Sequence, residues 1–254
     1  MHVVNASASS SAPAVGRGIY PLQVAAQLAQ LDVRAARRWA EGYTYIREGE
    51  RRASPGLMTL AMSRKGSEQD VTFAELLTLR LVKAFRDVKL GLPVIRRVAE
   101  RAAADYDLTM PFASRRFRTD GRKVFIELQR DQPGNDEAGV PARERELIEV
   151  LTRQRNFADI VEPSLFANVD WDGDSASRWW PMGKAQSIVL DPAIRFGAPR
   201  IDGTGVPTSA VAAAVRAEGG SETALKAVAD WYGVPLEGVQ DAMRFETEWL
   251  SKAA

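Results

Sequence analysis

The sequence predicts a mostly α-helical protein, with a helix pair and a two-stranded hairpin near its start and three short helices at its end. Two observations carry this prediction. Apolar residues recur every three or four positions over much of the 254 residues, and glycine and proline separate the C-terminal helical segments. We expect a tail over 1–15, a first domain over 16–130, a linker with a charged helix over 131–186, and a small three-helix domain over 187–254.

Residues 21–41 predict two short helices joined by a tight turn. Apolar residues follow helical spacing from Leu22 to Leu28. Asp32 is predicted to cap the second helix, since its carboxylate can accept hydrogen bonds from the first free backbone amides. Gly42 is predicted to end that helix, and Trp39 is predicted to pack inward and hold it on the first.

Two β-like runs follow, over 43–46 and 57–62, and the loop between them is rich in arginine. This pattern predicts a hairpin with a basic tip. A helix pair followed by such a hairpin is a shape that docks on duplex DNA, with the second helix in the major groove. The alternative is an ordinary surface helix pair with solvated arginines. The candidate DNA-binding residues are Arg34, Arg37, Arg38, Arg47, Arg51 and Arg52.

The rest of the first domain predicts two longer helices and a strand. Thr72 is predicted to cap an amphipathic helix, and Pro93 to begin the next one. Asp120 and Gly121 predict a turn into a strand over 123–128. Arginines at positions 96, 97 and 101 either touch DNA or form a solvated helix face.

The net charge of +1 hides an asymmetry between the two halves of the chain. Residues 16–130 carry 22 basic and 13 acidic side chains, whereas residues 131–254 carry 12 and 20. A basic half attracts phosphate polyanions. We therefore expect DNA as the partner of the first half and a different, basic partner for the second.

Composition excludes most catalytic and metal chemistry. The chain has no cysteine, and its one histidine is His2, in the low-complexity tail. We expect no enzyme activity, no catalytic residue, no metal site and no cofactor. Asp170, Asp172 and Asp174 suggest cation binding or a hydrolase that uses these carboxylates, but a solvated acidic turn is favoured. No window approaches the ~20 apolar residues of a membrane span, so we expect a cytoplasmic protein without membrane contact.

The N-terminal residues resemble a known family. The stretch from 20 to 25 and on through 37–43 is similar to the winged helix–turn–helix of MerR-type regulators. The resemblance implies DNA binding by the second helix, and it carries over to Arg37, Arg38 and Trp39. A stand-alone MerR-like regulator without a toxin is therefore one interpretation of the whole chain.

A second resemblance lies at the C-terminus. Residues 188–192, 196–201 and 203–208 resemble a homeodomain-like module of an uncharacterised family that occurs in VapB-type antitoxins, and the run 112–121 is similar to antitoxins that join both modules. The resemblance implies a homodimer that binds operator DNA, represses its own operon and neutralises a PIN-type ribonuclease toxin. The glycine-rich loop of this module lacks phosphate-binding spacing, so we expect it to be structural.

Trp179 and Trp180 are the candidate partner-binding residues, because adjacent tryptophans can form an aromatic anchor in an interface. Packing inside the chain is the alternative.

Overall fold

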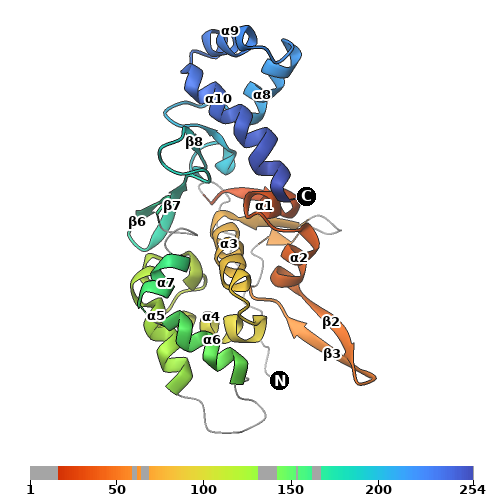
Figure 1. Cartoon of the computed structure of the whole chain (residues 1–254), viewed down its shortest axis with the longest axis vertical. Helices are drawn as coiled ribbons and strands as arrows, with labels where there is room; N and C mark the ends of the chain where they lie inside the picture. Colours follow the sequence, from red (N-terminus) through yellow and green to blue (C-terminus); the bar gives the residue numbers. More distant parts are fainter. Residues whose placement is uncertain are drawn as a thin grey trace, which may run out of the picture.

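The computed structural model describes residues 17–58, 62–63, 69–130, 142–152, 154–161 and 167–253, and this part of the chain is mostly helical, as expected. Figure 1 shows an elongated molecule with the C-terminal helices at one end. The helices are α1 (Leu22–Leu28), α2 (Val33–Glu41), α3 (Phe73–Asp87), α4 (Leu92–Tyr106), α5 (Arg115–Arg130), α6 (Ala142–Thr152), α7 (Gln154–Val161), α8 (Thr208–Ala217), α9 (Glu222–Tyr232) and α10 (Leu236–Arg244).

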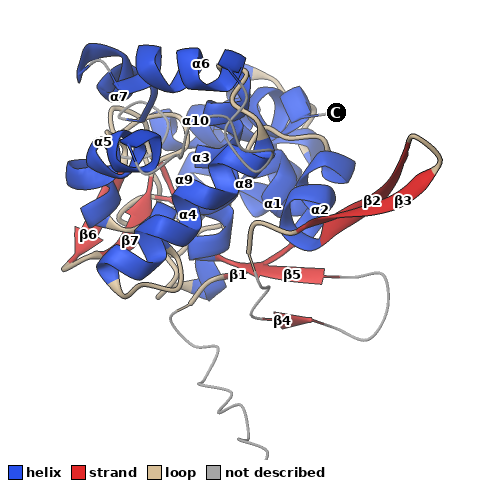
Figure 2. Cartoon of the chain, turned by 90° about the horizontal axis from the view of Figure 1, so that it is seen from below, coloured by secondary structure: helices blue, strands red, loops and turns tan. Residues whose placement is uncertain are grey.

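The strands are short and form small antiparallel sheets. One sheet has the order β1-β5-β4, and the others pair β2 with β3, β6 with β7 and β8 with β9. Figure 2 shows them at the edges of a helical body. Their bounds are β1 (Ile19–Pro21), β2 (Gly42–Arg47), β3 (Glu50–Pro55), β4 (Met62–Ser63), β5 (Gln69–Thr72), β6 (Val169–Asp172), β7 (Ser175–Trp179), β8 (Ile188–Val189) and β9 (Arg200–Ile201).

Helix α3 is the centre of the hydrophobic core. The predicted cap is confirmed: the Thr72 hydroxyl accepts from the backbone amide of Glu75, whose carboxylate accepts in return from the amide of Thr72. Seven apolar side chains of α3 are buried, and Phe85 packs edge-to-face with Phe112, Phe117 and Phe125. Aromatic packing therefore joins α3 to the segments that follow it in the chain.

The predicted strand over 123–128 is wrong, because these residues belong to helix α5. The buried residues Phe117, Val124, Phe125 and Leu128 recur at helical spacing. Gly121 is a packing residue inside this helix, since a Cβ there would lie 3.0 Å from the Phe157 ring of α7. The close approach of two helices therefore explains the glycine that the sequence pattern had suggested to be a turn.

The C-terminal part contains the three expected helices, α8, α9 and α10. Ser221 caps α9 by accepting from the amide of Ala224, and α10 runs on through one π-helical turn (Phe245–Trp249) and a 3₁₀ turn (Leu250–Ala253). The charged helix expected within 131–186 is divided into α6 and α7. The predicted linker over 131–141 lies outside the described residues, so the domain boundaries stay predictions.

The described helices include none that is both long and apolar enough to cross a membrane.

Replacing Gly121 with valine tests the assignment of α5 as a packed helix. We expect Gly121→Val to lower the free energy of unfolding by about 1–3 kcal/mol, because the added methyl groups meet Phe157 and Phe117 at close range. Thr119→Val, exposed on the same helix, should change it by less than about 0.5 kcal/mol. Urea unfolding of both variants measures the difference, and equal stabilities would contradict the close α5–α7 packing.

Candidate nucleic-acid interface

Helix α2 presents three arginines on one exposed face. Asp32 caps it as predicted, accepting from the amides of Arg34 and Ala35 at 2.9 and 3.0 Å. Ala36 and Ala40 are buried against the core on the opposite face. Because residues three and four apart share a helix face, Arg34, Arg37 and Arg38 form one exposed cationic surface.

The hairpin after α2 has a different register from the predicted one. Strand β2 pairs with β3 (Glu50–Pro55), whereas the expected partner run was 57–62, of which residues 59–61 lie outside the described part. The reason is a two-residue turn at Glu48 and Gly49, both at positive φ (55° and 81°), which closes the strands directly. Arg51 and Arg52 consequently lie on strand β3 and not in a tip loop.

One face of the hairpin continues from the arginines of α2. The Arg38 guanidinium lies 5.9 Å from the centroid of the Tyr43 ring, and the Tyr43 and Tyr45 rings are 5.8 Å apart. Tyr45 pairs across the hairpin with Arg52, which also forms an ion pair with Glu50 at 3.4 Å. The opposite face carries Arg51. The arginines thus divide between two faces of the hairpin.

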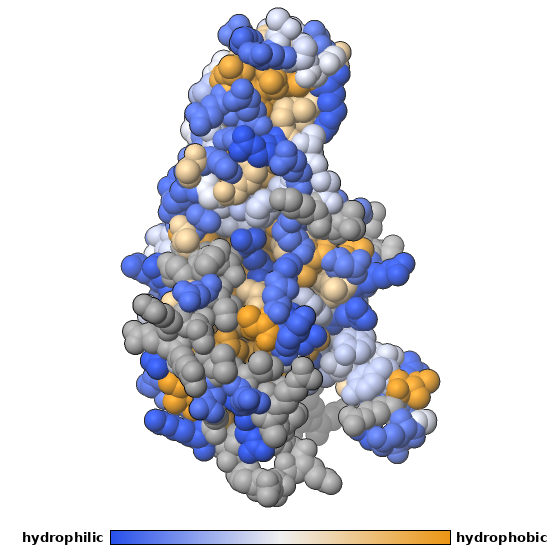
Figure 3. Space-filling model, viewed as in Figure 1, coloured by the Kyte–Doolittle hydropathy of each residue, from blue (hydrophilic) through white to orange (hydrophobic). Residues whose placement is uncertain are grey.

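Two glycines lock the hairpin to α2. Gly42 follows the last residue of α2, as predicted, at φ +87°, and any side chain there would collide with the backbone of Ser54 and Gly56. A side chain at Gly56 would collide with the carbonyl of Ala40. The junction therefore fixes the direction in which the hairpin leaves the body, as the separate, mostly hydrophilic lobe in Figure 3 shows.

Arg96 of α4 holds the base of the hairpin. Its guanidinium donates to the hydroxyl of Ser54 at 3.3 Å and to the carbonyl of Pro55. Arg101 on the same helix pairs with Asp105 at 3.0 Å and with Glu127 of α5 at 3.3 Å. Arg96 therefore fits neither alternative, DNA contact or a solvated helix face, because it stabilises the base of the hairpin.

The two predicted partner anchors are buried inside the chain. Trp179 is 0% exposed and Trp180 is 6% exposed. The Trp179 ring packs against the guanidinium of Arg80, while Arg178 and Lys184 lie over the ring of Trp180. Neither indole offers an exposed surface, so the structure favours packing within the chain.

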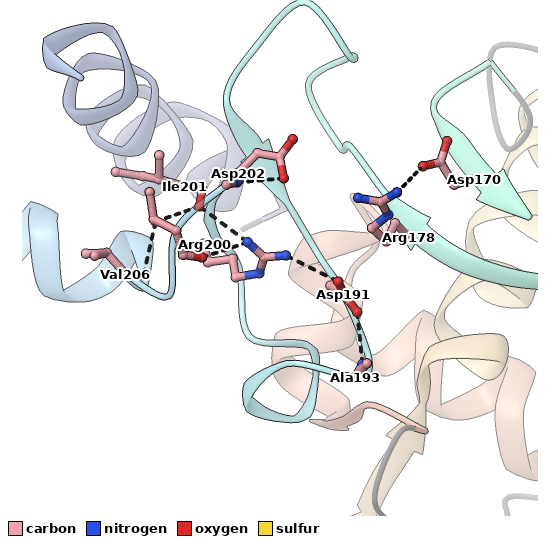
Figure 4. Close-up of polar contacts among 10 residues, drawn as sticks. Asp170, Arg178, Asp191, Ala193, Arg200, Ile201, Asp202 and Val206 are labelled. Atoms are coloured by element: carbon pink, nitrogen blue, oxygen red, sulfur yellow. Dashed lines mark hydrogen bonds and ion pairs between the residues drawn. The ribbon is translucent and has the colours of Figure 1, made fainter. Parts of the chain in front are cut away.

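Two of the three aspartates of the β6–β7 hairpin are paired with cations. Asp170 contacts Arg178 at 3.0 Å and Lys184 at 2.6 Å, and Asp174 contacts Arg116 at 2.8 Å. Figure 4 shows the Asp170–Arg178 pair beside the glycine-rich loop. Among the described residues, no group of three or more His, Cys, Asp or Glu side chains converges as a metal ligand set.

The glycine-rich loop is organised by a buried arginine. The Arg200 guanidinium pairs with Asp191 at 3.2 Å and donates to the carbonyl of Thr204 at 2.7 Å (Figure 4). The Thr204 hydroxyl in turn donates to the carbonyl of Ile201. These bonds hold the loop against its own strand.

Sequence reasoning missed the support of the hairpin by Arg96, the tyrosine stack on β2, and an exposed Ile46, which is 78% accessible. The sequence shows Tyr43, Tyr45 and Ile46 as neighbours in one short run, so a local pattern could have indicated them. The contact of Arg96 connects residues more than 40 positions apart, and no local pattern signals it.

Comparisons with known sequences support an antitoxin-like family. A family model described as "Protein of unknown function (DUF433)" matches residues 188–245, which span β8 to the end of α10. The chain is 30% identical over 220 residues to "Putative antitoxin VapB45" of Mycobacterium tuberculosis (strain ATCC 25618 / H37Rv), covering 81% of this chain and 84% of that protein. This chain belongs to the family of that antitoxin.

A solved structure has the same fold. The crystal structure of Rv2018 from Mycobacterium tuberculosis superposes with a TM-score of 0.65 at 24% sequence identity, covering 88% of this chain and 96% of that one. The arrangement of helices and hairpin is therefore shared over nearly the whole length of both chains.

Proposed function

We propose that this chain is the DNA-binding antitoxin of a toxin–antitoxin operon. It binds double-stranded operator DNA as a homodimer in the cytoplasm, represses its own operon and neutralises a PIN-type ribonuclease toxin. It acts by binding, without covalent chemistry, metal or cofactor. Helix α2 and the β2–β3 hairpin serve as recognition helix and wing of a MerR-like winged helix–turn–helix, and α8–α10 serve as the homeodomain-like module.

The observation that carries DNA binding is the exposed arginine face of α2, which continues onto an anchored hairpin. A groove-binding helix needs long donors on one face, and arginine donates in pairs to guanine edges. A wing needs a fixed direction, and Gly42, Gly56 and Arg96 supply it. The relationship to the family of an antitoxin supports a toxin partner.

A stand-alone MerR-like regulator is the second candidate, because the DNA-binding surface does not depend on a toxin. The protein encoded by the adjacent gene distinguishes the antitoxin from the stand-alone regulator. An antitoxin inhibits the nuclease activity of that product, and a regulator does not.

Binding to duplex DNA should fall steeply with salt. If the arginines of the interface and its flanks neutralise about 6–10 phosphates, the affinity should drop about 10³–10⁵-fold between 50 and 200 mM salt. Fluorescence anisotropy with a labelled duplex measures this slope. An affinity that stays constant across the series would contradict an electrostatic interface.

Substitutions in α2 and in the wing should have different effects. Arg37→Ala or Arg38→Ala should cost about 1–3 kcal/mol on the operator if the residue contacts guanine, and less on unrelated DNA. Arg51→Ala and Arg52→Ala should each weaken binding to both DNAs alike, because the Glu50–Arg52 pair is exposed and gives way to a phosphate. Equal losses for all four variants on both DNAs would show that α2 does not read sequence.

The full chain should inhibit the product of the adjacent gene. We expect a stable complex on co-expression and loss of that product's ribonuclease activity at a ratio near equimolar. Size-exclusion chromatography and a labelled RNA substrate measure the two effects. Ribonuclease activity that persists with excess chain would favour the regulator.

A further inference from the structure

The positive charge of residues 66–130 is concentrated on a single helix. This stretch has 13 basic and 9 acidic side chains, and α5 alone holds six of the basic and two of the acidic ones. The remainder of the stretch is therefore balanced. Residues 32–55, which form α2 and the hairpin, hold six basic and four acidic side chains. Helix α5 is thus more positive than the candidate interface itself.

The basic residues of α5 lie along its outer face. Phe117, Val124, Phe125 and Leu128 are buried on the inner face, and the cations occupy the rest of the helix surface over a length of about 24 Å, since a helix rises about 1.5 Å per residue. This basic stripe comprises Arg115, Arg118, Arg122, Lys123 and Arg130, all exposed except Arg122, which is half-buried.

The contact that Lys123 makes is weak and exchangeable. Lys123 lies 3.6 Å from Glu127, with 76% of its side chain exposed. Exposed pairs of this kind contribute about 0–1 kcal/mol and give way to a stronger anion. Arg122 is the exception, because it donates to the carbonyl of Thr152 and holds α6.

A cavity of about 570 Å³ opens along the stripe between α5 and α7. The lining includes Arg118, Arg122, Lys123 and Arg130 from α5 and Phe157 and Val161 from α7. Asp120 and Glu127 also line the cavity, and Glu127 already pairs with Arg101 and Lys123. The four cations therefore outnumber the two acidic groups.

Both views of the molecule separate this stripe from the candidate interface. In Figures 1 and 2, α3 and α4 lie between α5 on one side and α2 with the β2–β3 hairpin on the other. We propose that the basic stripe of α5 is a second nucleic-acid surface, which binds the phosphate backbone of duplex DNA independently of α2. This surface goes beyond the proposed recognition of an operator.

The composition of the stripe favours a duplex over a single strand. Proteins that bind single strands stack the bases on exposed aromatic rings. The two aromatic residues of α5, Phe117 and Phe125, are both buried at 0% exposure. A regular helix of charged side chains instead fits the regular spacing of duplex phosphates, without reading sequence.

The test uses the full chain carrying Arg37→Ala and Arg38→Ala, and a 30-bp duplex of arbitrary sequence. We expect the variant with Arg37→Ala and Arg38→Ala to retain salt-dependent binding to this duplex. Adding Lys123→Ala and Arg130→Ala should weaken it at least about tenfold and lower the salt slope by about 2, one for each lost phosphate contact. Because the operator plays no part, the result does not depend on whether the proposed function is correct.

The control removes two matched cations elsewhere. Lys226 pairs with Glu222 at four residues' distance, as Lys123 does with Glu127, and Arg216 lies in the last turn of α8, as Arg130 does in α5. Arg216→Ala with Lys226→Ala should leave binding unchanged. Equal losses in the control, no loss in the α5 variant, or stronger binding of single-stranded RNA than of duplex DNA would each overturn the proposal. Thermal unfolding and the glutamine variants Lys123→Gln and Arg130→Gln exclude a loss of fold.

Discussion

A single half-buried arginine joins three distant segments of the chain. Arg80 of the central helix lies 4.8 Å from the ring centroid of Trp179 and 5.9 Å from that of Trp249. Burial lowers the pKa of Arg80 to about 10, so the group still carries its charge at neutral pH. Burying a charge is costly, and the faces of two indoles offset part of that cost. The β6–β7 hairpin and the C-terminus are therefore attached to α3 through one cation.

The helix pair of the candidate interface depends on the same assembly. Tyr20, just before α1, donates to the carbonyl of Gly197 at 3.0 Å, and Gln30, just after α1, donates to the carbonyl of Trp249 at 2.7 Å. Burial and the nearby charge of Asp191 raise the pKa of Tyr20, so it stays a neutral donor. The C-terminal segment thus holds α1, and α1 holds α2. Trp179 belongs to this support, which explains why it is buried rather than exposed to a partner.

The parts of the fold that the sequence predicted are those decided within a few residues. The caps at Asp32, Thr72 and Ser221 and the three C-terminal helices follow from local chemistry. The strand predicted over 123–128 is wrong, because Gly121 leaves room for the Phe157 ring of α7 and does not form a turn. The candidate arginines of α2 were predictable from helical spacing, whereas the burial of Trp179 and the role of Arg96 depend on contacts between distant segments.

The distribution of charge also changes once the residues are placed in space. Counting along the chain makes the hairpin appear to have a basic tip. In the structure its turn is Glu48–Gly49, and the charges of Glu48 and Glu50 balance those of Arg47 and Arg52, so the tip itself has little net charge. The positive potential of this region therefore arises from α2 and from Arg51, while most of the remaining excess lies on α5. Because Coulomb attraction between exposed charges fades within about 8 Å at physiological salt, two basic surfaces on opposite sides of a protein act separately. We therefore expect a polyanion to meet two independent surfaces on the described part of the chain, and we propose that α2 and its hairpin are the ones that enter a groove.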